Sequence, residues 1–95
     1  MAIKIIIRRK VPKEKEEALV PLLIALRSKA TTQPGYISGE TLRNVEDSEE
    51  FIVISTWQSV DAWRSWESSK ERGEVQERIE EILEGKTEYG IYLYG

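Results

Sequence analysis

The sequence contains no histidine and no cysteine among its 95 residues. The lack of histidine removes the commonest general base and the commonest metal ligand of proteins. The lack of cysteine removes disulfide bonds, thiolate nucleophiles and cysteine metal sites, and it is typical of a cytoplasmic protein. We therefore expect a cytoplasmic protein without a metal site, in which any chemistry depends on aromatic, amide, arginine and carboxylate side chains.

Strong net charge and long apolar runs are missing as well. The 17 acidic and 14 basic residues leave a net charge of -3, which does not indicate a nucleic-acid or anionic-membrane surface. No apolar run is long enough to span a membrane, and residues 1–4 lack the features of a signal peptide. We expect a single domain over residues 1–95 that binds neither nucleic acid nor membrane. The basic cluster Arg8-Arg9-Lys10 is expected to be a solvated strand end.

The middle third of the chain gives the clearest pattern. Pro34-Gly35 marks a turn, because proline cannot extend a helix and glycine accepts a positive φ. Two runs rich in β-branched and aromatic residues follow, at 36–43 and 51–57, and their polar connection indicates an antiparallel hairpin. Ser59 then stands where a helix N-cap is expected. The stretch predicts a turn, two paired strands and the start of a helix.

The flanking segments predict two more strands and two more helical stretches. The strands are expected at 3–10 and 88–94, and the two helices at 13–30 and 74–83. The helix that starts at Ser59 is expected to run over 59–69. Pro21 interrupts the first helical pattern, and we expect either a kink there or a break that starts a second helix. Gly85 is a suitable residue to end the last helix in the left-handed conformation.

The order strand, helix, strand, strand, helix, strand predicts an α+β protein of the ferredoxin-like, split βαβ type. Its four-stranded antiparallel sheet has helices on one face only. The predicted strands nevertheless carry large apolar side chains of both parities, such as Ile5 beside Ile6 and Val53 beside Ile54. We therefore expect a homodimer in which a second copy covers the other sheet face.

Four features along the chain go beyond this general pattern. They are the turn Pro34-Gly35-Tyr36, the strand from Ser38 to Arg43, the string Ile54-Ser55-Thr56-Trp57-Gln58-Ser59, and the helix with Ala62 and Trp66. Together they resemble the antibiotic biosynthesis monooxygenase family of dimeric α/β barrels. The resemblance implies two sheets paired face to face. It also implies either a cofactor-independent monooxygenase, which oxidises a phenol or quinol with O₂, or a haem-degrading protein of another branch.

The resemblance also indicates where a site would lie. In many quinol-oxidising relatives, histidines occupy the positions of Trp66 and approximately Glu71. The haem-degrading branch has a tryptophan at the position of Trp66, but its axial histidine aligns with Gln76 and its pocket asparagine with Ile7. A primary amide is a poor haem ligand compared with imidazole. We therefore expect no cofactor and no haem degradation.

An aromatic pocket for a planar phenol or quinol is the function that this resemblance favours. The catalytic candidates are Trp66, Gln76 and Asn44, and the substrate-binding candidates are Trp63, Arg64, Tyr92, Tyr94 and Ile7. Without histidine, the base would be a perturbed carboxylate such as Glu40, or the bound anion itself. We further expect Trp57 to be structural and Trp66 to face the ligand.

Three functions stay open at this point. The first is a small monooxygenase whose partner molecule is a planar aromatic compound. The second is a binding module that keeps the fold without the chemistry, which the missing histidines favour. The third, a haem-binding or haem-degrading protein, has the least support in the sequence.

Overall fold

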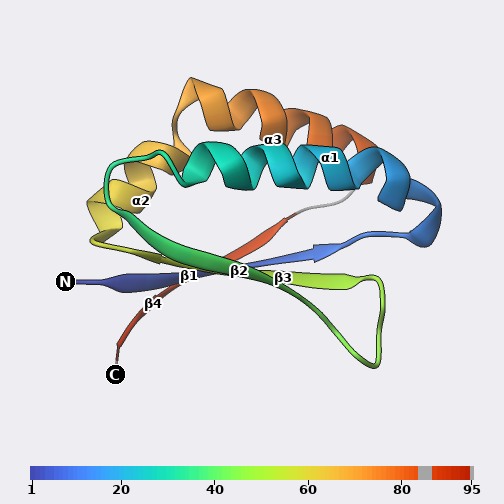
Figure 1. The fold of residues 1–95 in the computed structure, drawn as a ribbon, viewed down its shortest axis with the longest axis horizontal. Helices are drawn as coiled ribbons and strands as arrows, with labels where there is room; N and C mark the ends of the chain where they lie inside the picture. Colours follow the sequence, from blue (N-terminus) through green and yellow to red (C-terminus); the bar gives the residue numbers. More distant parts are fainter. Residues whose placement is uncertain (84–86, 95) are drawn as a thin grey trace.

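The structure is a computed structural model that describes residues 1–83 and 87–94. The elements within these ranges are β1 (Ile3–Lys10), α1 (Lys13–Ala30), β2 (Tyr36–Arg43), β3 (Glu50–Trp57), α2 (Val60–Glu67), α3 (Lys70–Leu83) and β4 (Glu88–Leu93). The four strands form one antiparallel sheet in the order β2-β3-β1-β4, and the helices lie on one of its faces (Figure 1). The predicted ferredoxin-like α+β fold is confirmed. No helix in the described ranges is long and apolar enough to cross a membrane.

The helices differ from the predicted pattern at two places. Helix α1 continues through Pro21, so of the two expectations stated for this residue, a kink or a break, the break does not occur. Pro21 is exposed, while Leu19 and Leu26 on either side of it are buried and hold both halves against the protein. Helix α3 begins at Lys70, before the predicted start, because the Ser69 hydroxyl accepts the backbone N–H of Arg72 at 3.1 Å as a cap. Gly85, the predicted helix end, lies outside the described residues.

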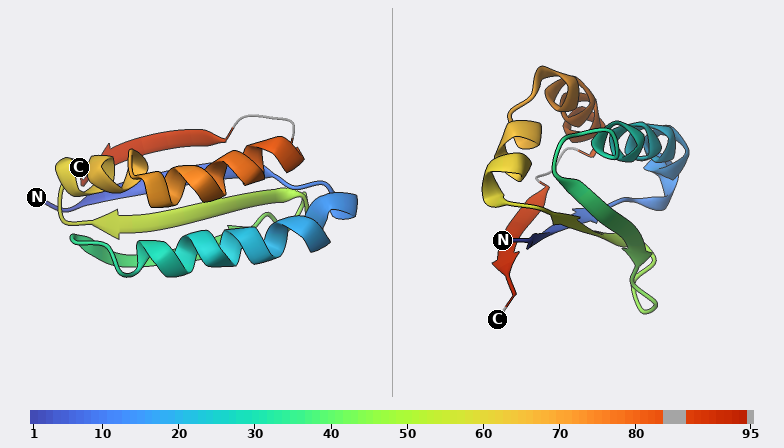
Figure 2. Two further views of the ribbon diagram at one scale, coloured as in Figure 1. Left: turned by 90° about the horizontal axis from the view of Figure 1, so that it is seen from above. Right: turned by 60° about the vertical axis from the view of Figure 1, so that its left-hand side comes forward.

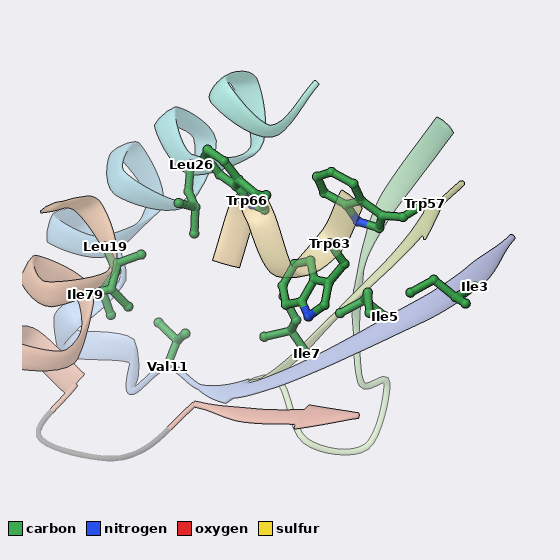
Figure 3. Close-up of a cluster of buried hydrophobic side chains, with 10 residues drawn as sticks. All are labelled: Ile3, Ile5, Ile7, Val11, Leu19, Leu26, Trp57, Trp63, Trp66 and Ile79. Atoms are coloured by element: carbon green, nitrogen blue, oxygen red, sulfur yellow. The ribbon is translucent and has the colours of Figure 1, made fainter. Parts of the chain in front are cut away.

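The main core lies between the helices and one face of the sheet. Ile3, Ile5 and Ile7 of β1 all point to this face and are buried, as the alternation of side chains along a strand requires (Figure 3). Trp57 of β3 packs among aromatic rings, with its centroid 5.4 Å from that of Tyr36 and 5.8 Å from that of Trp63. Its indole N–H donates to the Ser55 hydroxyl at 3.1 Å. The core therefore satisfies this buried donor.

The other face of the sheet is also apolar, and no described segment covers it (Figure 2). Ile6, Ile52 and Ile54 are half-buried there. In the strand register, Ile6 lies opposite Ile54, and Ile52 lies opposite Leu42. Leu42 and Tyr92 are 46% and 52% exposed. We call these five residues, Ile6, Leu42, Ile52, Ile54 and Tyr92, the open face. The large apolar side chains expected on both faces of the sheet are present.

A turn glycine and a helix glycine offer a matched test of this fold. Gly35 has φ +87°, and a Cβ built there would lie 2.5 Å from the Ala62 Cβ. We expect Gly35→Ala to lower the free energy of unfolding by more than about 1 kcal/mol, from backbone strain and overlap together. Gly73, inside α3, has open space around it. Gly73→Ala should stabilise the protein by up to about 1 kcal/mol.

Urea unfolding of both variants, followed by tryptophan fluorescence, checks this pair. Equal midpoints for Gly35→Ala and the unchanged protein would show that the turn accepts a side chain and would contradict the packing described here.

Candidate functional site

A cavity of ≈ 80 Å³ lies between the helices and the β2–β3 side of the sheet. Five aromatic residues line it: Tyr36, Phe51, Trp57, Trp63 and Trp66. Including the space that is open to solvent, the hollow measures ≈ 700 Å³. Aromatic walls of this kind recognise flat rings by stacking and edge contacts. The cavity is therefore suited to part of a planar molecule that enters from outside.

Local sequence signals place these aromatic side chains. The turn at Gly35 starts β2, so that Tyr36 opposes Trp57 in the register. The Ser59 hydroxyl accepts the N–H of Ala62 at 3.1 Å and fixes the start of α2. Trp63 and Trp66, three residues apart, then share the buried side of this helix. In Figure 3, Trp66 lies beside Leu26 of α1. Trp66 also lines a second hollow beside Pro34 and Gly35.

Two buried arginines also line the cavity. Arg9 is 3% exposed and Arg72 is 5% exposed. Neither forms an ion pair with a carboxylate in the described ranges. Burial lowers the pKa of the Arg9 guanidinium, and the positive charge of Arg72 lowers this pKa further, while Tyr89 and Glu80 oppose these effects. The cavity wall therefore carries positive charge in an apolar setting.

A polar layer behind the cavity holds Arg9 in place. Arg9 Nη2 donates to Gln76 Oε1 at 3.1 Å. The Gln76 amide nitrogen donates to Glu80 Oε1 at 2.6 Å and to Thr87 Oγ1 at 3.0 Å. Because both of these acceptors engage the amide nitrogen, the amide oxygen is left to face the guanidinium. Gln76 thus orients Arg9 and does not itself line the cavity.

Aromatic rings and a phenol hydroxyl hold Arg72. Its Nη2 donates to the Tyr89 hydroxyl. Its guanidinium carbon lies 5.2 Å from the centroid of the Tyr89 ring and 5.6 Å from that of Trp63. Contacts with aromatic faces of this kind stabilise a cation without neutralising its charge. The positive charge of Arg72 consequently remains available to a ligand.

Three further donor groups of the cavity wall have no hydrogen-bond partner among the described residues. Arg9 Nε and Trp63 Nε1 are buried donors of this kind. The Tyr36 hydroxyl lies over Gly39, where a Cβ would approach it to 2.6 Å, and it has no hydrogen-bond partner among the described residues. Unpaired buried donors are rare in folded proteins. The wall therefore presents unused donor capacity to whatever fills the cavity.

The structure brings together some of the predicted site residues. Trp63, Trp66 and Ile7 line the cavity, and Gln76 lies directly behind it. Trp57, expected to be purely structural, is buried and also borders the cavity.

Other predicted residues lie elsewhere. Asn44 is exposed in the hairpin connection, where its side chain bonds Glu50 and the N–H of Glu46, as asparagine commonly does in turns. Arg64 is exposed and pairs with Glu67 at 2.8 Å. Tyr92 belongs to the open face, and Tyr94 is exposed beyond the end of β4.

Arg9, Arg72 and Tyr36 are the site residues that the sequence reading missed. The expectation that Arg9 belongs to a solvated strand end is wrong, since Arg9 is buried. One signal was available, because Arg9 has the same strand parity as Ile5 and Ile7 and must point to the helix side.

Glu40, the carboxylate candidate, borders the cavity, but it lies opposite Ile54 in the strand register and so has the parity of the open face.

Haem does not fit these residues. The cavity of ≈ 80 Å³ is far smaller than a porphyrin, and the chain has neither histidine nor cysteine as an axial ligand. The Gln76 amide is engaged by Glu80 and Thr87. Within residues 1–83 and 87–94, no group of three or more acidic, histidine or cysteine side chains is placed to hold a metal ion. No haem chemistry is assigned to this site.

Solved structures of known proteins share this fold. A conserved protein from Methanosarcina mazei Go1 has a TM-score of 0.89 and 22% identity, over 97% of this chain and 91% of that chain. An antibiotic biosynthesis monooxygenase has a TM-score of 0.87 and 15% identity, over 98% of each chain. A mutant of SnoaB, a cofactor-independent oxygenase from Streptomyces nogalater, has a TM-score of 0.86 and 16% identity, over 98% of this chain and 92% of that chain.

At these identities the solved structures show the fold alone. No curated protein matches the chain. The profile of one family, described as antibiotic biosynthesis monooxygenase, matches residues 2–78, which is most of the chain and includes β1, the hairpin and α2. The resemblance drawn from the sequence is thereby confirmed, and the chain belongs to the antibiotic biosynthesis monooxygenase family.

Proposed function

We propose that the protein is a cofactor-independent monooxygenase that oxidises a planar phenol or quinol with O₂. The observation that carries this proposal is the cavity itself, whose walls combine five aromatic residues with two buried arginines. Family membership supports a monooxygenase-like role, and the likeness to SnoaB supports the cofactor-independent form. The substrate ring would lie against Trp66 and Trp63.

The proposed reaction takes all its electrons from the substrate. A ring CH₂ group of the phenol's keto tautomer becomes C=O and supplies the four electrons that O₂ requires. One oxygen atom enters the product and the other leaves as water. The protein binds the ring, stabilises the substrate anion that reacts with O₂, and excludes water from the cavity.

A ligand-binding module without chemistry is the second candidate. It is favoured by the lack of a general base: the chain contains no histidine, and Glu40 has the strand parity of the open face. Both candidates use the same cavity and the same aromatic walls. Consumption of O₂ in the presence of ligand distinguishes them.

A homodimer formed through the open face is part of this proposal. Ile6, Ile52 and Ile54 are half-buried in the single chain, and Leu42 and Tyr92 beside them are largely exposed. An antiparallel sheet that faces water normally presents polar side chains there. Stable interfaces bury about 800 Å² on each partner. A second copy would bury these apolar side chains against their own equivalents.

Oxygen uptake on addition of hydroquinones, naphthols and anthrones tests the enzymatic proposal. We expect uptake of one O₂ per product formed with at least one compound. Trp66→Phe, which shortens the aromatic wall, should lower kcat/KM at least about tenfold. Ile79→Val is the control, because Ile79 is buried but does not line the cavity. It should lose about 0.5–1.5 kcal/mol of stability and keep its activity.

The absence of uptake with every compound, together with tight binding of one of them, would assign the protein to the ligand-binding candidate. Equal activities of Trp66→Phe and the unchanged protein would show that Trp66 only packs in the core and does not contact the substrate.

Sedimentation equilibrium at micromolar concentration tests the dimer. The expected mass is twice the 11.0 kDa of one chain. Ile54→Lys places a charge in the open face and should give a monomer of lower stability, because the apolar interface is lost. Val45→Lys is the control, since Val45 is 98% exposed in the hairpin connection and should leave the dimer intact. A cooperatively folded monomer of the unchanged chain would contradict the proposal.

A further inference from the structure

We propose that the cavity binds its aromatic ligand as an anion, and that the guanidinium groups of Arg9 and Arg72 stabilise the negatively charged oxygen. The ligand class is a phenol or aryl acid that places one ring in the cavity. This inference rests on the proposed function and deepens it, because it names the substrate class and the residues that select it.

The first support is the unusual placement of positive charge. Burying a cation is expensive unless an anion accompanies it, and Arg9 and Arg72 are both nearly fully buried. In the described part of the chain, no carboxylate pairs with either guanidinium. The nearest compensation for Arg9 is indirect, since Glu80 bonds to Gln76 and Gln76 bonds to Arg9. An anionic ligand in the cavity would supply the missing partner.

The second support is the set of donors that border the same cavity. Arg9 Nε and the indole N–H of Trp63 are buried without a partner in the described residues. Both residues line the cavity together with Arg72. In Figure 3, the indole nitrogen of Trp63 lies on the side of the ring that faces Ile7, another cavity residue. An oxygen with several lone pairs fits this wall, whereas a hydrogen-bond donor does not.

The third support is that the positive groups are held in place before a ligand arrives. Gln76 fixes one end of Arg9 through Nη2, which leaves Nε free. Arg72 is fixed by the Tyr89 hydroxyl and by the rings of Tyr89 and Trp63. Donors that are already oriented lose little conformational freedom on binding. The site can therefore select charge as well as shape.

The size of the cavity limits the ligand. Pockets that enclose drug-sized molecules measure roughly 300–1,000 Å³, and this cavity has ≈ 80 Å³. At most one ring can enter, with the remainder of the molecule in the space that opens to solvent. The anionic oxygen would approach the arginines, while the ring lies among the aromatic residues.

Stabilisation of the anion also answers the question of the missing base. A phenol bound beside two guanidinium groups loses its proton more readily, because the nearby positive charges favour the phenolate. Arginine stays protonated at any physiological pH and cannot itself accept that proton. The proton therefore passes to solvent water outside the cavity as the phenolate forms. The arginines would promote deprotonation by Coulomb attraction, where other proteins use a histidine.

Titration of 4-nitrophenol with the whole protein tests this inference, since absorbance reports its phenolate directly. We expect the pKa of the bound phenol to fall by at least about one unit, which corresponds to a tenfold preference for the phenolate. Arg9→Met and Arg72→Met should each remove most of this shift. Arg8→Met is the matched control, because Arg8 is the exposed neighbour of Arg9 on the opposite face of β1. It should keep the full shift.

Unfolding of the same variants separates a binding role from a structural one. If the arginines serve a ligand, replacing them with methionine removes an unpaired buried charge and leaves the free energy of unfolding unchanged or higher. A structural role predicts a clear loss of stability in both variants and an unchanged 4-nitrophenol shift in whichever still folds. That pair of results would overturn the inference.

A second pair of probes distinguishes carboxylate from phenolate. Quenching of tryptophan fluorescence measures the binding of 4-nitrobenzoate and of its neutral counterpart, 4-nitrobenzamide. Tenfold tighter binding of the benzoate supports an aryl acid, and a shift in 4-nitrophenol alone supports a phenol. Equal binding of benzoate and benzamide without a phenol shift, or no binding of any probe, overturns the inference.

The outcome is distinguishable from that of the proposed function. Anion preference without O₂ uptake leaves the anion site standing and refutes the oxygenase. Oxidation of neutral phenols without any anion preference refutes the anion site alone.

Discussion

The alternation of side chains along β1 is the constraint on which the rest of the molecule depends. This strand lies between β3 and β4, so both of its edges are occupied by hydrogen bonds and only its two faces remain. The residues of one parity, from Ile3 to Arg9, point toward the helices and supply both the core and the cavity wall. Those of the other parity, such as Ile6, point to the open face. One strand thus links the stability of the core, the charge of the site and the surface proposed for dimerisation.

The fold was predictable because local signals agree with one another. A turn glycine with positive φ, an N-cap serine and strands of clear β propensity each specify an element that tertiary packing then accepts. Where packing and a local preference conflict, packing can override the local preference. Proline disfavours the interior of a helix, yet α1 continues through Pro21 because buried leucines on both sides hold it.

The two tryptophans of α2 were the predictable part of the candidate site, whereas its arginines and Tyr36 were not predicted. Spacing of three places Trp63 and Trp66 on one side of a helix, and the structure has them in the cavity wall. Composition rules treat an arginine at a strand end as exposed, and they fail for Arg9 because strand parity decides its direction. The polar layer of Gln76, Glu80 and Thr87 joins two separate segments, and no local pattern reveals that contact. Hydrogen bonds between residues far apart in the sequence can be identified only from the folded structure.

The free-energy cost of burying two arginines has to be compared with the small overall stability of a 95-residue domain. Aromatic faces, one phenol hydroxyl and one amide oxygen accompany the two charges, and each compensates only in part. Apolar residues of similar volume would pack the same space at lower cost, as is found when buried ion pairs are replaced. Packing alone therefore does not explain why the charges are there. An anion that enters the cavity would pair with the two guanidinium groups and offset the free-energy cost of burying their charges. This gain would add to the affinity of the site for the anion. The parity of β1 therefore both buries Arg9 and places its positive charge in the cavity wall, where that charge can bind an anion.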